Sequence, residues 1–264
     1  QDLFVSSYYG SVDETARTFL QLPNNAPTMK LYRNKGDGTF QDVSQSAGLA
    51  VYMPMGGNFG DIDNDGFLDI YQGVGNPSYA SLTPSVLLHN RQGQTFVNVT
   101  ASSGTGEIHK GHGVAFADLD GDGDEEIVFE VGGATPGDRH ALRLFENPGH
   151  GNDWLNLKLT GAKTNRGAIG ARIAVTVTDA RGASRRIHRV VSSGGSFGAS
   201  PLQQHIGLGR SARSVDVEVS WPVSGTRQRF TGVSPNQTID VTELSDTYVR
   251  VERPRVRLGG PAAP

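Results

Sequence analysis

Residues 118–126 have the sequence Asp-Leu-Asp-Gly-Asp-Gly-Asp-Glu-Glu, with acidic residues at positions one, three, five and nine and glycine at position six. Residues 61–69, Asp-Ile-Asp-Asn-Asp-Gly-Phe-Leu-Asp, repeat that arrangement 57 residues earlier. Carboxylates at this density repel one another unless a cation lies between them. Two copies in one chain therefore indicate a repeated structural unit rather than two unrelated acidic turns.

The same spacing extends beyond the two acidic loops. The segment 31–34 recurs in related form at 87–90 and 144–147, and the segment 40–43 recurs at 96–99. These repeated pieces are short β-type runs separated by glycine, aspartate and asparagine, which favours hairpins over helices. About four short strands in each 50 to 60 residues is the size of a propeller blade.

The beginning of the chain fits the same register. Asp2 aligns with Asp69, the last acid of the first loop, at a spacing of 67 residues. This first unit therefore contains about ten extra residues, which we place within 11–25. Because a closed propeller typically has four or more blades, we expect the missing blades upstream of Gln1, in another chain, or replaced by a different closure.

After Asn147 the period ends and a different series of strand candidates begins. Residues 215–221 alternate apolar and polar side chains, which is typical of a strand with one buried face. Seven such short strands with frequent turns indicate a β-sandwich or jelly-roll-like domain. We therefore predict an all-β chain with a partial β-propeller of about two to three blades over 1–150, the second domain over 151–244, and a Pro/Gly/Arg-rich tail over 245–264.

Composition excludes several classes of protein and site. The 264 residues include no cysteine, which excludes disulfides, a thiol nucleophile and cysteine-ligated zinc. The net charge of −3 gives no indication of a nucleic-acid surface. Apolar runs all fall short of the roughly 18 to 20 residues that a membrane-spanning helix needs.

The two acidic loops have the chemistry of calcium sites, because calcium prefers oxygen ligands in a flexible geometry. Glycine at position six permits a sharp turn, and position seven offers a backbone carbonyl. The predicted ligands are Asp61, Asp63, Asp65, the carbonyl of Phe67 and Asp69 in the first loop, and Asp118, Asp120, Asp122, the carbonyl of Asp124 and Glu126 in the second.

Two other interpretations of these loops are weaker. An EF-hand needs glutamate at position twelve and flanking helices, whereas position twelve is Gln72 or Phe129, each within a β-type run. Magnesium prefers compact octahedral sites that retain water. The remaining alternative is a pair of acidic hairpin turns with solvated charges.

The repeats resemble the FG-GAP and VCBS calcium-binding blades of integrin-like β-propellers, on the hairpin at 31–40 and the metal loop at 60–66. The second half resembles an ASPIC/UnbV domain, on residues 165–172, 205–209, 221–222, 224–225 and 236–237. This order of parts is that of proteins related to cartilage acidic protein. The resemblance implies calcium-dependent folding, a secreted or cell-surface location, and no well-defined enzymatic activity.

A few residues outside the loops could have a different role. His109 and His112, with Glu130 nearby in the sequence, are candidates for a site on a propeller face. His205 lies in an alternating strand, and we expect a core or edge histidine. Trp221 precedes Pro222, which favours a buried ring at the end of a strand over an exposed sugar-binding platform.

The sequence thus predicts a non-enzymatic extracellular module with two Ca²⁺ ions that serves adhesion or structure. We expect self-assembly, or assembly with other surface proteins or glycans, because an incomplete blade set leaves an unpaired edge strand. The alternative is a polysaccharide-binding protein or polysaccharide-active enzyme with its site on the propeller face.

Overall fold

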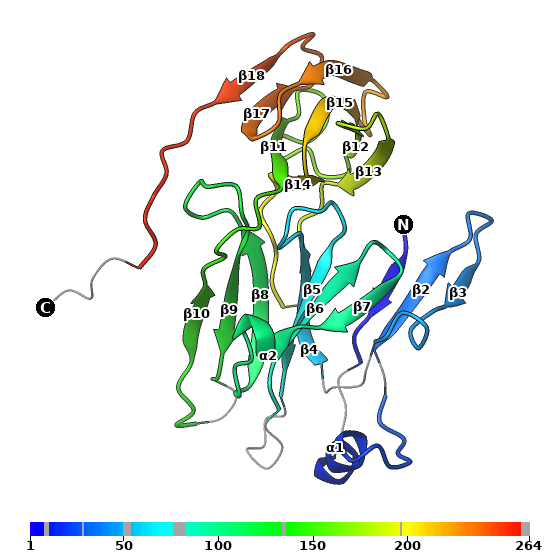
Figure 1. Ribbon diagram of the computed structural model, residues 1–264, viewed down its shortest axis with the longest axis vertical. Helices are drawn as coiled ribbons and strands as arrows, with labels where there is room; N and C mark the ends of the chain where they lie inside the picture. Colours follow the sequence, from blue (N-terminus) through cyan, green and yellow to red (C-terminus); the bar gives the residue numbers. More distant parts are fainter. Residues whose placement is uncertain are drawn as a thin grey trace, which may run out of the picture.

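The computed structural model describes residues 1–7, 11–27, 29–49, 54–75, 83–133, 136–195 and 197–259. Within these ranges the fold consists of five small β-sheets and two short helices, with small sheets arranged in the manner of a β-propeller in the N-terminal part (Figure 1). The predicted all-β class is therefore confirmed. The described residues include no helix long and apolar enough to cross a membrane.

Three antiparallel sheets follow one another along the N-terminal part. The first contains β1 (Leu3–Val5), β2 (Lys30–Asn34) and β3 (Phe40–Asp42); the second contains β4 (Pro54–Gly60), β5 (Asp69–Val74), β6 (Val86–Arg91) and β7 (Thr95–Asn98); the third contains β8 (Gly111–Ala117), β9 (Glu126–Val131) and β10 (Ala141–Phe145). The acidic loops join β4 to β5 and β8 to β9, so they occupy equivalent places in neighbouring sheets. The division of these sheets into blades stays a prediction.

Strand β5 shows how the neighbouring sheets are held together. All six of its residues are buried, and successive side chains point to opposite faces. Ile70 therefore packs in one apolar cluster, with Val86 and Leu88, while Tyr71 packs in another, with Phe129. Each large apolar side chain buried in this way contributes roughly 1.5–3 kcal/mol. The first loop ends where β5 begins, so its position is fixed by both clusters.

The predicted insertion at 11–25 contains a helix that the sequence analysis did not anticipate. Helix α1 (Val12–Phe19) begins with a capping box between Ser11 and Glu14, and Arg17 pairs with Asp13 one turn away. A second helix, α2 (Thr100–Ser103), is a single turn that ends at Gly104 in a left-handed conformation. Neither helix interrupts the sheets, because both lie in connections between strands.

The C-terminal part contains two four-stranded sheets around one core. Their strands are β11 (Asp153–Thr160), β12 (Arg172–Asp179), β13 (Ser184–Val190), β14 (Gln204–Gly209), β15 (Ala212–Ser220), β16 (Arg227–Val233), β17 (Gln237–Thr242) and β18 (Tyr248–Val251), in the orders β14-β11-β17-β18 and β13-β12-β15-β16. The expected alternation in β15 is present, since Val215, Val217 and Val219 are buried in the shared core. The jelly-roll-like assignment stays a prediction.

Strand β18 lies within the segment predicted to be a tail. It pairs antiparallel with β17, where Thr238 faces Val251. The chain beyond it also has a contact, because the Val256 N–H donates to the Asp120 carbonyl at 2.7 Å. The part of 245–264 that the structure describes is therefore attached to the rest of the molecule, and residues 260–264 lie outside the described ranges.

The C-terminal sheets lie at the end of the N-terminal sheets where the two acidic loops project (Figure 1). Strand β14 is the edge of its sheet, and the first loop covers that edge. The Gly209 N–H donates to the Asn64 carbonyl at 2.8 Å, and the Gly207 N–H donates to Asp61 Oδ2 at 3.1 Å. The first loop therefore packs between the two parts of the chain.

Candidate metal centre

The two acidic loops have the same backbone shape. Position four is left-handed in both, with φ of 57° at Asn64 and 78° at Gly121. Position six has φ of 94° at Gly66 and 95° at Gly123, a conformation that side chains disfavour and glycine adopts readily. A Cβ atom at Gly123 would also lie 1.9 Å from the Trp154 ring. The glycine at position six is therefore required by both conformation and space.

The first loop is closed by hydrogen bonds from its backbone to its own carboxylates. Asp63 Oδ1 accepts from the Asp65 N–H at 3.2 Å, and Asp65 Oδ1 accepts from the Phe67 N–H at 2.8 Å. Asp69 Oδ2 accepts from the Ile62 N–H at 3.0 Å. These bonds turn the acidic side chains toward the inside of the loop.

The second loop repeats this pattern position for position. Asp120 Oδ1 accepts from the Asp122 N–H at 3.1 Å, and Asp122 Oδ1 accepts from the Asp124 N–H at 2.9 Å. Glu126 takes the place of Asp69, and its Oε2 accepts from the Leu119 N–H at 2.8 Å. Sequence repeats and loop geometry therefore agree.

Three groups of side chains bring potential metal-ligating atoms within 4.8 Å of one another. Two lie in the first loop, and one of these includes a histidine that follows in β6; the third lies in the second loop. The groups are Asp61 with Asp63 and Asp69, Asp63 with Asp65 and His89, and Asp118 with Asp120 and Asp122. These acidic clusters could hold metal ions.

One buried carboxylate oxygen in each loop lacks a hydrogen-bond partner. These atoms are Asp61 Oδ1, at position one of the first loop, and Glu126 Oε1, at position nine of the second. Asp61 has no exposed surface and Glu126 is 1% exposed. Because an unpaired buried acceptor costs about 1–3 kcal/mol or more when charged, these oxygens need a cation or a proton. The donor set is entirely oxygen, which fits a hard cation such as Ca²⁺.

The pKa values of the loop carboxylates show the same need. The pKa of Asp61 is raised to about 7 and that of Asp69 to about 8, chiefly by burial and in part by neighbouring carboxylates. Burial likewise raises the pKa of Glu126 to about 7. A cation within the loops would oppose these shifts, since it favours the charged form of each carboxylate.

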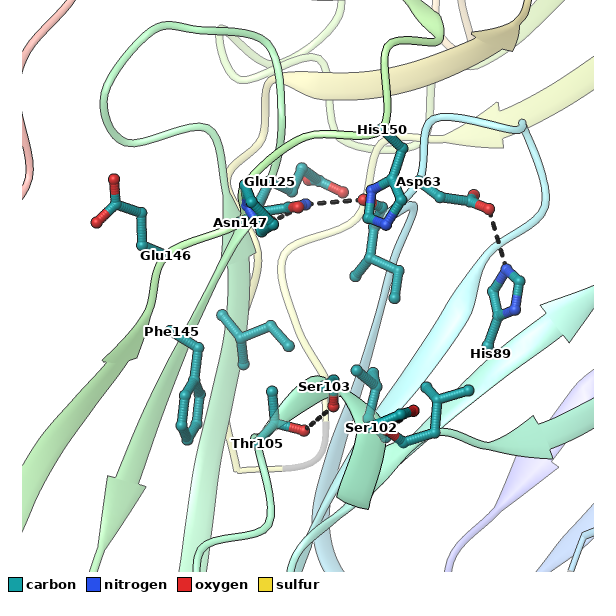
Figure 2. Close-up of a pocket in the computed structure, with 15 residues that line it drawn as sticks. Asp63, His89, Ser102, Ser103, Thr105, Glu125, Phe145, Glu146, Asn147 and His150 are labelled. Atoms are coloured by element: carbon teal, nitrogen blue, oxygen red, sulfur yellow. Dashed lines mark hydrogen bonds and ion pairs between the residues drawn. The ribbon is translucent and has the colours of Figure 1, made fainter.

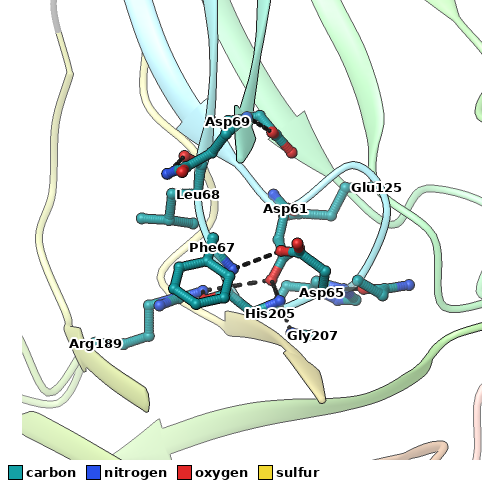
Figure 3. Close-up of polar contacts among 12 residues, drawn as sticks. Asp61, Asp65, Phe67, Leu68, Asp69, Glu125, Arg189, His205 and Gly207 are labelled. Atoms are coloured by element: carbon teal, nitrogen blue, oxygen red, sulfur yellow. Dashed lines mark hydrogen bonds and ion pairs between the residues drawn. The ribbon is translucent and has the colours of Figure 1, made fainter. Parts of the chain in front are cut away.

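The C-terminal part contributes directly to the first loop (Figure 3). Arg189, near the end of β13, places Nη2 3.5 Å from Asp61 Oδ2 and 3.4 Å from the Gly66 carbonyl. Arg185 lies over the Phe67 ring, 5.6 Å from its centroid. Protein cations thus compensate part of the charge on Asp61 but leave its second oxygen unpaired.

Two segments of the chain match known family models. Residues 1–71, which include the first acidic loop, match the model of the FG-GAP-like repeat, and residues 161–247 match the model of the ASPIC and UnbV domain. The two C-terminal sheets, which contain the second match, are called the ASPIC/UnbV domain below.

Two curated relatives match about half of the chain. Cartilage acidic protein 1 of Homo sapiens is 31% identical over 130 residues, which is 48% of this chain and 18% of that protein. The Mus musculus protein of the same name is 30% identical over 130 residues, again 48% of this chain and 18% of that protein. The alignments thus span less than a fifth of these relatives. A solved structure of a candidate cell adhesion protein from Bacteroides ovatus covers 86% of this chain and 95% of its own, at 12% identity and a TM-score of 0.27, too low to indicate a shared fold.

The predicted carboxylates Asp61, Asp63, Asp65 and Asp69 of the first loop and Asp118, Asp120 and Asp122 of the second belong to the potential metal-ligating groups, whereas Glu126 belongs to none of them. The backbone N–H of Phe67 donates to Asp65, and that of Asp124 donates to Asp122. The role of the Phe67 and Asp124 carbonyls as metal ligands stays a prediction. His205 is buried, as expected, between two asparagine side chains. Trp221 is also buried, at 2% exposure, and its indole N–H donates to Gln228. The sugar-platform interpretation of Trp221 is therefore wrong.

The candidates for a site on the propeller face, His109, His112 and Glu130, lie outside the acidic loops. His109 lies 4.0 Å from Asp138, whose other oxygen pairs at 2.8 Å with Lys110, a lysine with no exposed surface. Glu130 is exposed on β9. None of these residues belongs to a potential metal-ligating group among the described residues.

Sequence reasoning missed the residues that join the loops to each other. Glu125 is buried, and its Oε2 accepts from the Asp61 N–H at 2.9 Å, so an acid of the second loop supports the first. Asn147 donates from Nδ2 to the Ile62 carbonyl at 2.7 Å. The repeat did contain a signal for Asn147, because asparagine ends each of the repeated tetrapeptides. No local pattern, however, indicates a contact with a residue 85 positions away.

A cavity of about 440 Å³ lies beside the first loop (Figure 2). Its floor is apolar, with Leu87 and Phe145 among the lining residues. Its rim includes the Asp63–His89 pair, joined at 3.0 Å, and His150. This cavity, rather than the surface near His109, is where a small ligand would find polar groups beside an apolar floor.

Proposed function

We propose that the chain is a non-enzymatic, extracellular calcium-binding module for adhesion or structural assembly, with one Ca²⁺ in each acidic loop. The observation that carries the proposal is the unpaired buried carboxylate oxygen in each of two matching loops, Asp61 Oδ1 and Glu126 Oε1. The FG-GAP-like match over residues 1–71 supports calcium as the ion, and the families matched are non-enzymatic in kind. The similarity to cartilage acidic protein 1 supports an extracellular location.

Thermal unfolding tests this proposal directly. Calcium at saturating concentration should raise the melting temperature of the metal-free chain, and magnesium at the same concentration should raise it much less, because magnesium gives up its water ligands reluctantly. An unchanged melting temperature with calcium would show that the loops are ordinary acidic turns.

Self-assembly is the second part of the proposal. Among the described strands, β10 pairs only with β9, so one of its edges is unpaired. Its side chains Leu142 and Leu144 are 71% and 46% exposed. Such an edge favours pairing with another strand. Size-exclusion chromatography in calcium should show an oligomer at high protein concentration, and a strictly monomeric chain would contradict this part of the proposal.

A polysaccharide-binding function is the alternative, and the cavity beside the first loop favours it over a purely structural role. Glycan binding would then require His89 or His150 at the rim of the cavity. A glycan array with the calcium-loaded chain, compared with His89→Ala and with His112→Ala outside the cavity, decides between the two. The structural proposal predicts no signal for any of the three proteins, whereas the alternative predicts a signal that only His89→Ala reduces.

A further inference from the structure

Asn64 connects the first loop to the second. It occupies position four of the first loop and has no exposed surface. Its Nδ2 donates to the Gly123 carbonyl and to Asp124 Oδ1, both at 2.9 Å. The second loop therefore receives hydrogen bonds from the first at its turn glycine and at the residue predicted to supply a carbonyl ligand.

The ASPIC/UnbV domain makes a second connection between the loops. His205 on β14 lies between two amide groups, with Nε2 2.5 Å from Asn64 Oδ1 and Nδ1 2.7 Å from Asn156 Oδ1. Asn156 on β11 is fully buried, and its Nδ2 donates to Asp118 Oδ2 at 3.1 Å. A continuous path of buried polar contacts thus runs from position one of the second loop through the domain to position four of the first.

The free edge of β14 holds the first loop from its other side. Gly207 donates its N–H to Asp61 Oδ2, at position one, and a Cβ atom at Gly207 would lie 2.4 Å from the Asn64 carbonyl carbon. Loop and strand are therefore in backbone contact at this point. Any displacement of the domain would move both Asp61 and Asn64.

We infer that the ASPIC/UnbV domain joins the two loops into one binding unit, with Asn156 and Gly207 as positioning residues, so that two divalent cations bind with positive cooperativity. This inference rests on the proposed function, since it needs both loops to bind cations. A cation that fixes Asp118 in the second loop also fixes Asn156 and His205, and through them Asn64. The first loop is then already ordered when its own cation arrives, which raises its affinity.

Trp154 lies against the second loop and provides an optical signal for it. Its ring packs against Gly123 and stacks on His205, with ring centroids 6.2 Å apart. The other tryptophan, Trp221, lies in the core of the ASPIC/UnbV domain. Terbium, a hard trivalent ion that occupies calcium sites, should therefore be sensitised by Trp154 when it binds the second loop.

The test is a terbium titration of the full chain followed by Trp154-sensitised luminescence. Asp63→Ala removes a ligand of the first loop only, and we expect it to weaken terbium binding at the second loop by about five- to tenfold. In an Asn156→Ala background the same Asp63→Ala change should have a clearly smaller effect on the second loop, because only the direct contacts of Asn64 and Glu125 then join the loops. Gly207→Ala, which forces the first loop off β14, should likewise reduce the effect.

The matched control is Gly194→Ala, since a Cβ atom at Gly194 meets nothing within 4 Å. In that background the five- to tenfold effect should persist. An affinity of the second loop that Asp63→Ala leaves unchanged, or an effect that keeps its full size in both Asn156→Ala and Gly207→Ala, would overturn the inference. No terbium or calcium uptake by the unaltered chain would instead overturn the proposed function on which it rests.

Discussion

Buried carboxylates are stabilised in two different ways in the two parts of this chain. In the ASPIC/UnbV domain, Glu243 is 2% exposed and accepts hydrogen bonds from the N–H groups of Ala162, Lys163 and Thr164 at 2.6–2.7 Å. Hydroxyl groups of Thr164 and Ser224 donate to its other oxygen. In the acidic loops, by contrast, Asp61 and Glu126 each keep an unpaired buried oxygen.

The pKa values follow this difference in donors. Burial acts to raise the pKa of Glu243, but the hydrogen bonds from Ser224 and from Thr164 outweigh it and lower the pKa to about 2. Burial raises the pKa of Asp61 to about 7, and the donors around it do not compensate. A carboxylate can therefore remain charged inside this protein without metal, provided that enough N–H and O–H groups surround it. The loops supply too few of those groups to Asp61 Oδ1 and Glu126 Oε1, which is the physical reason for expecting an ion there.

Removal of calcium should produce the largest change in stability. Two sites, each saturated at about one hundred times its dissociation constant, would together contribute about 5 kcal/mol to the free energy of unfolding. We therefore expect a chelator to lower the melting temperature by roughly 10 °C or more. Differential scanning calorimetry with and without chelator measures this shift. An unchanged melting temperature in chelator would contradict the claim that the loop carboxylates, unlike Glu243, are stabilised by a bound cation.

Glu243→Ala should destabilise the chain by a smaller amount, about 3 kcal/mol, because it leaves three N–H groups and two hydroxyls without their acceptor. The loss should be the same in calcium and in chelator, since this carboxylate is stabilised by protein donors alone. Urea unfolding under both conditions measures it. A loss that depends on calcium would show that the two regions are not independent.

Asp120→Ala should cost about 2–3 kcal/mol in calcium and much less in chelator, unlike Glu243→Ala, whose cost should not depend on calcium. Its matched control is Asp37→Ala, an acidic turn residue that accepts hydrogen bonds from Thr39 within its own hairpin. Urea unfolding of both variants should show calcium-dependent destabilisation for Asp120→Ala alone. Equal losses with and without calcium would assign Asp120 a purely structural role.

The smallest effect that we predict is a change in the direction of the pH dependence. The folded-state pKa values of Asp61 and Asp69 are raised, so in chelator their contribution is present below about pH 4 and is lost as the pH rises toward 7 to 8. Metal-free melting temperatures should thus fall by a few degrees between pH 5 and pH 8. With calcium this decline should disappear, because bound metal requires the deprotonated carboxylates. A metal-free chain that gains stability over this range would contradict the raised pKa values.

The sequence was sufficient to predict the acidic loops because their chemistry is local. Spacing alone places Asp61, Asp63 and Asp65 on one turn, and glycine at position six is required by the conformation of that turn. Alternating residues likewise predicted β15 and the buried position of Trp221. The repeat register also located the insertion that helix α1 occupies, although it did not indicate a helix.

The connection between the two parts could not be predicted from the sequence. Asn64 contacts Asp124 and His205, which are 60 and 141 residues away. Such contacts depend on how the sheets pack, and no periodicity records that packing. Strand β18 was missed for a similar reason, since its few residues are stabilised by pairing with β17 rather than by an apolar pattern of their own.

The central claim is that the two loops need cations that the rest of the chain does not. Isothermal titration of Ca²⁺ into the metal-free chain, repeated with Asp63→Ala and with Asp120→Ala, tests it most directly. We predict two bound Ca²⁺ ions per chain, and one for each variant. Absence of calcium uptake, or a stoichiometry that neither substitution alters, would contradict the claim.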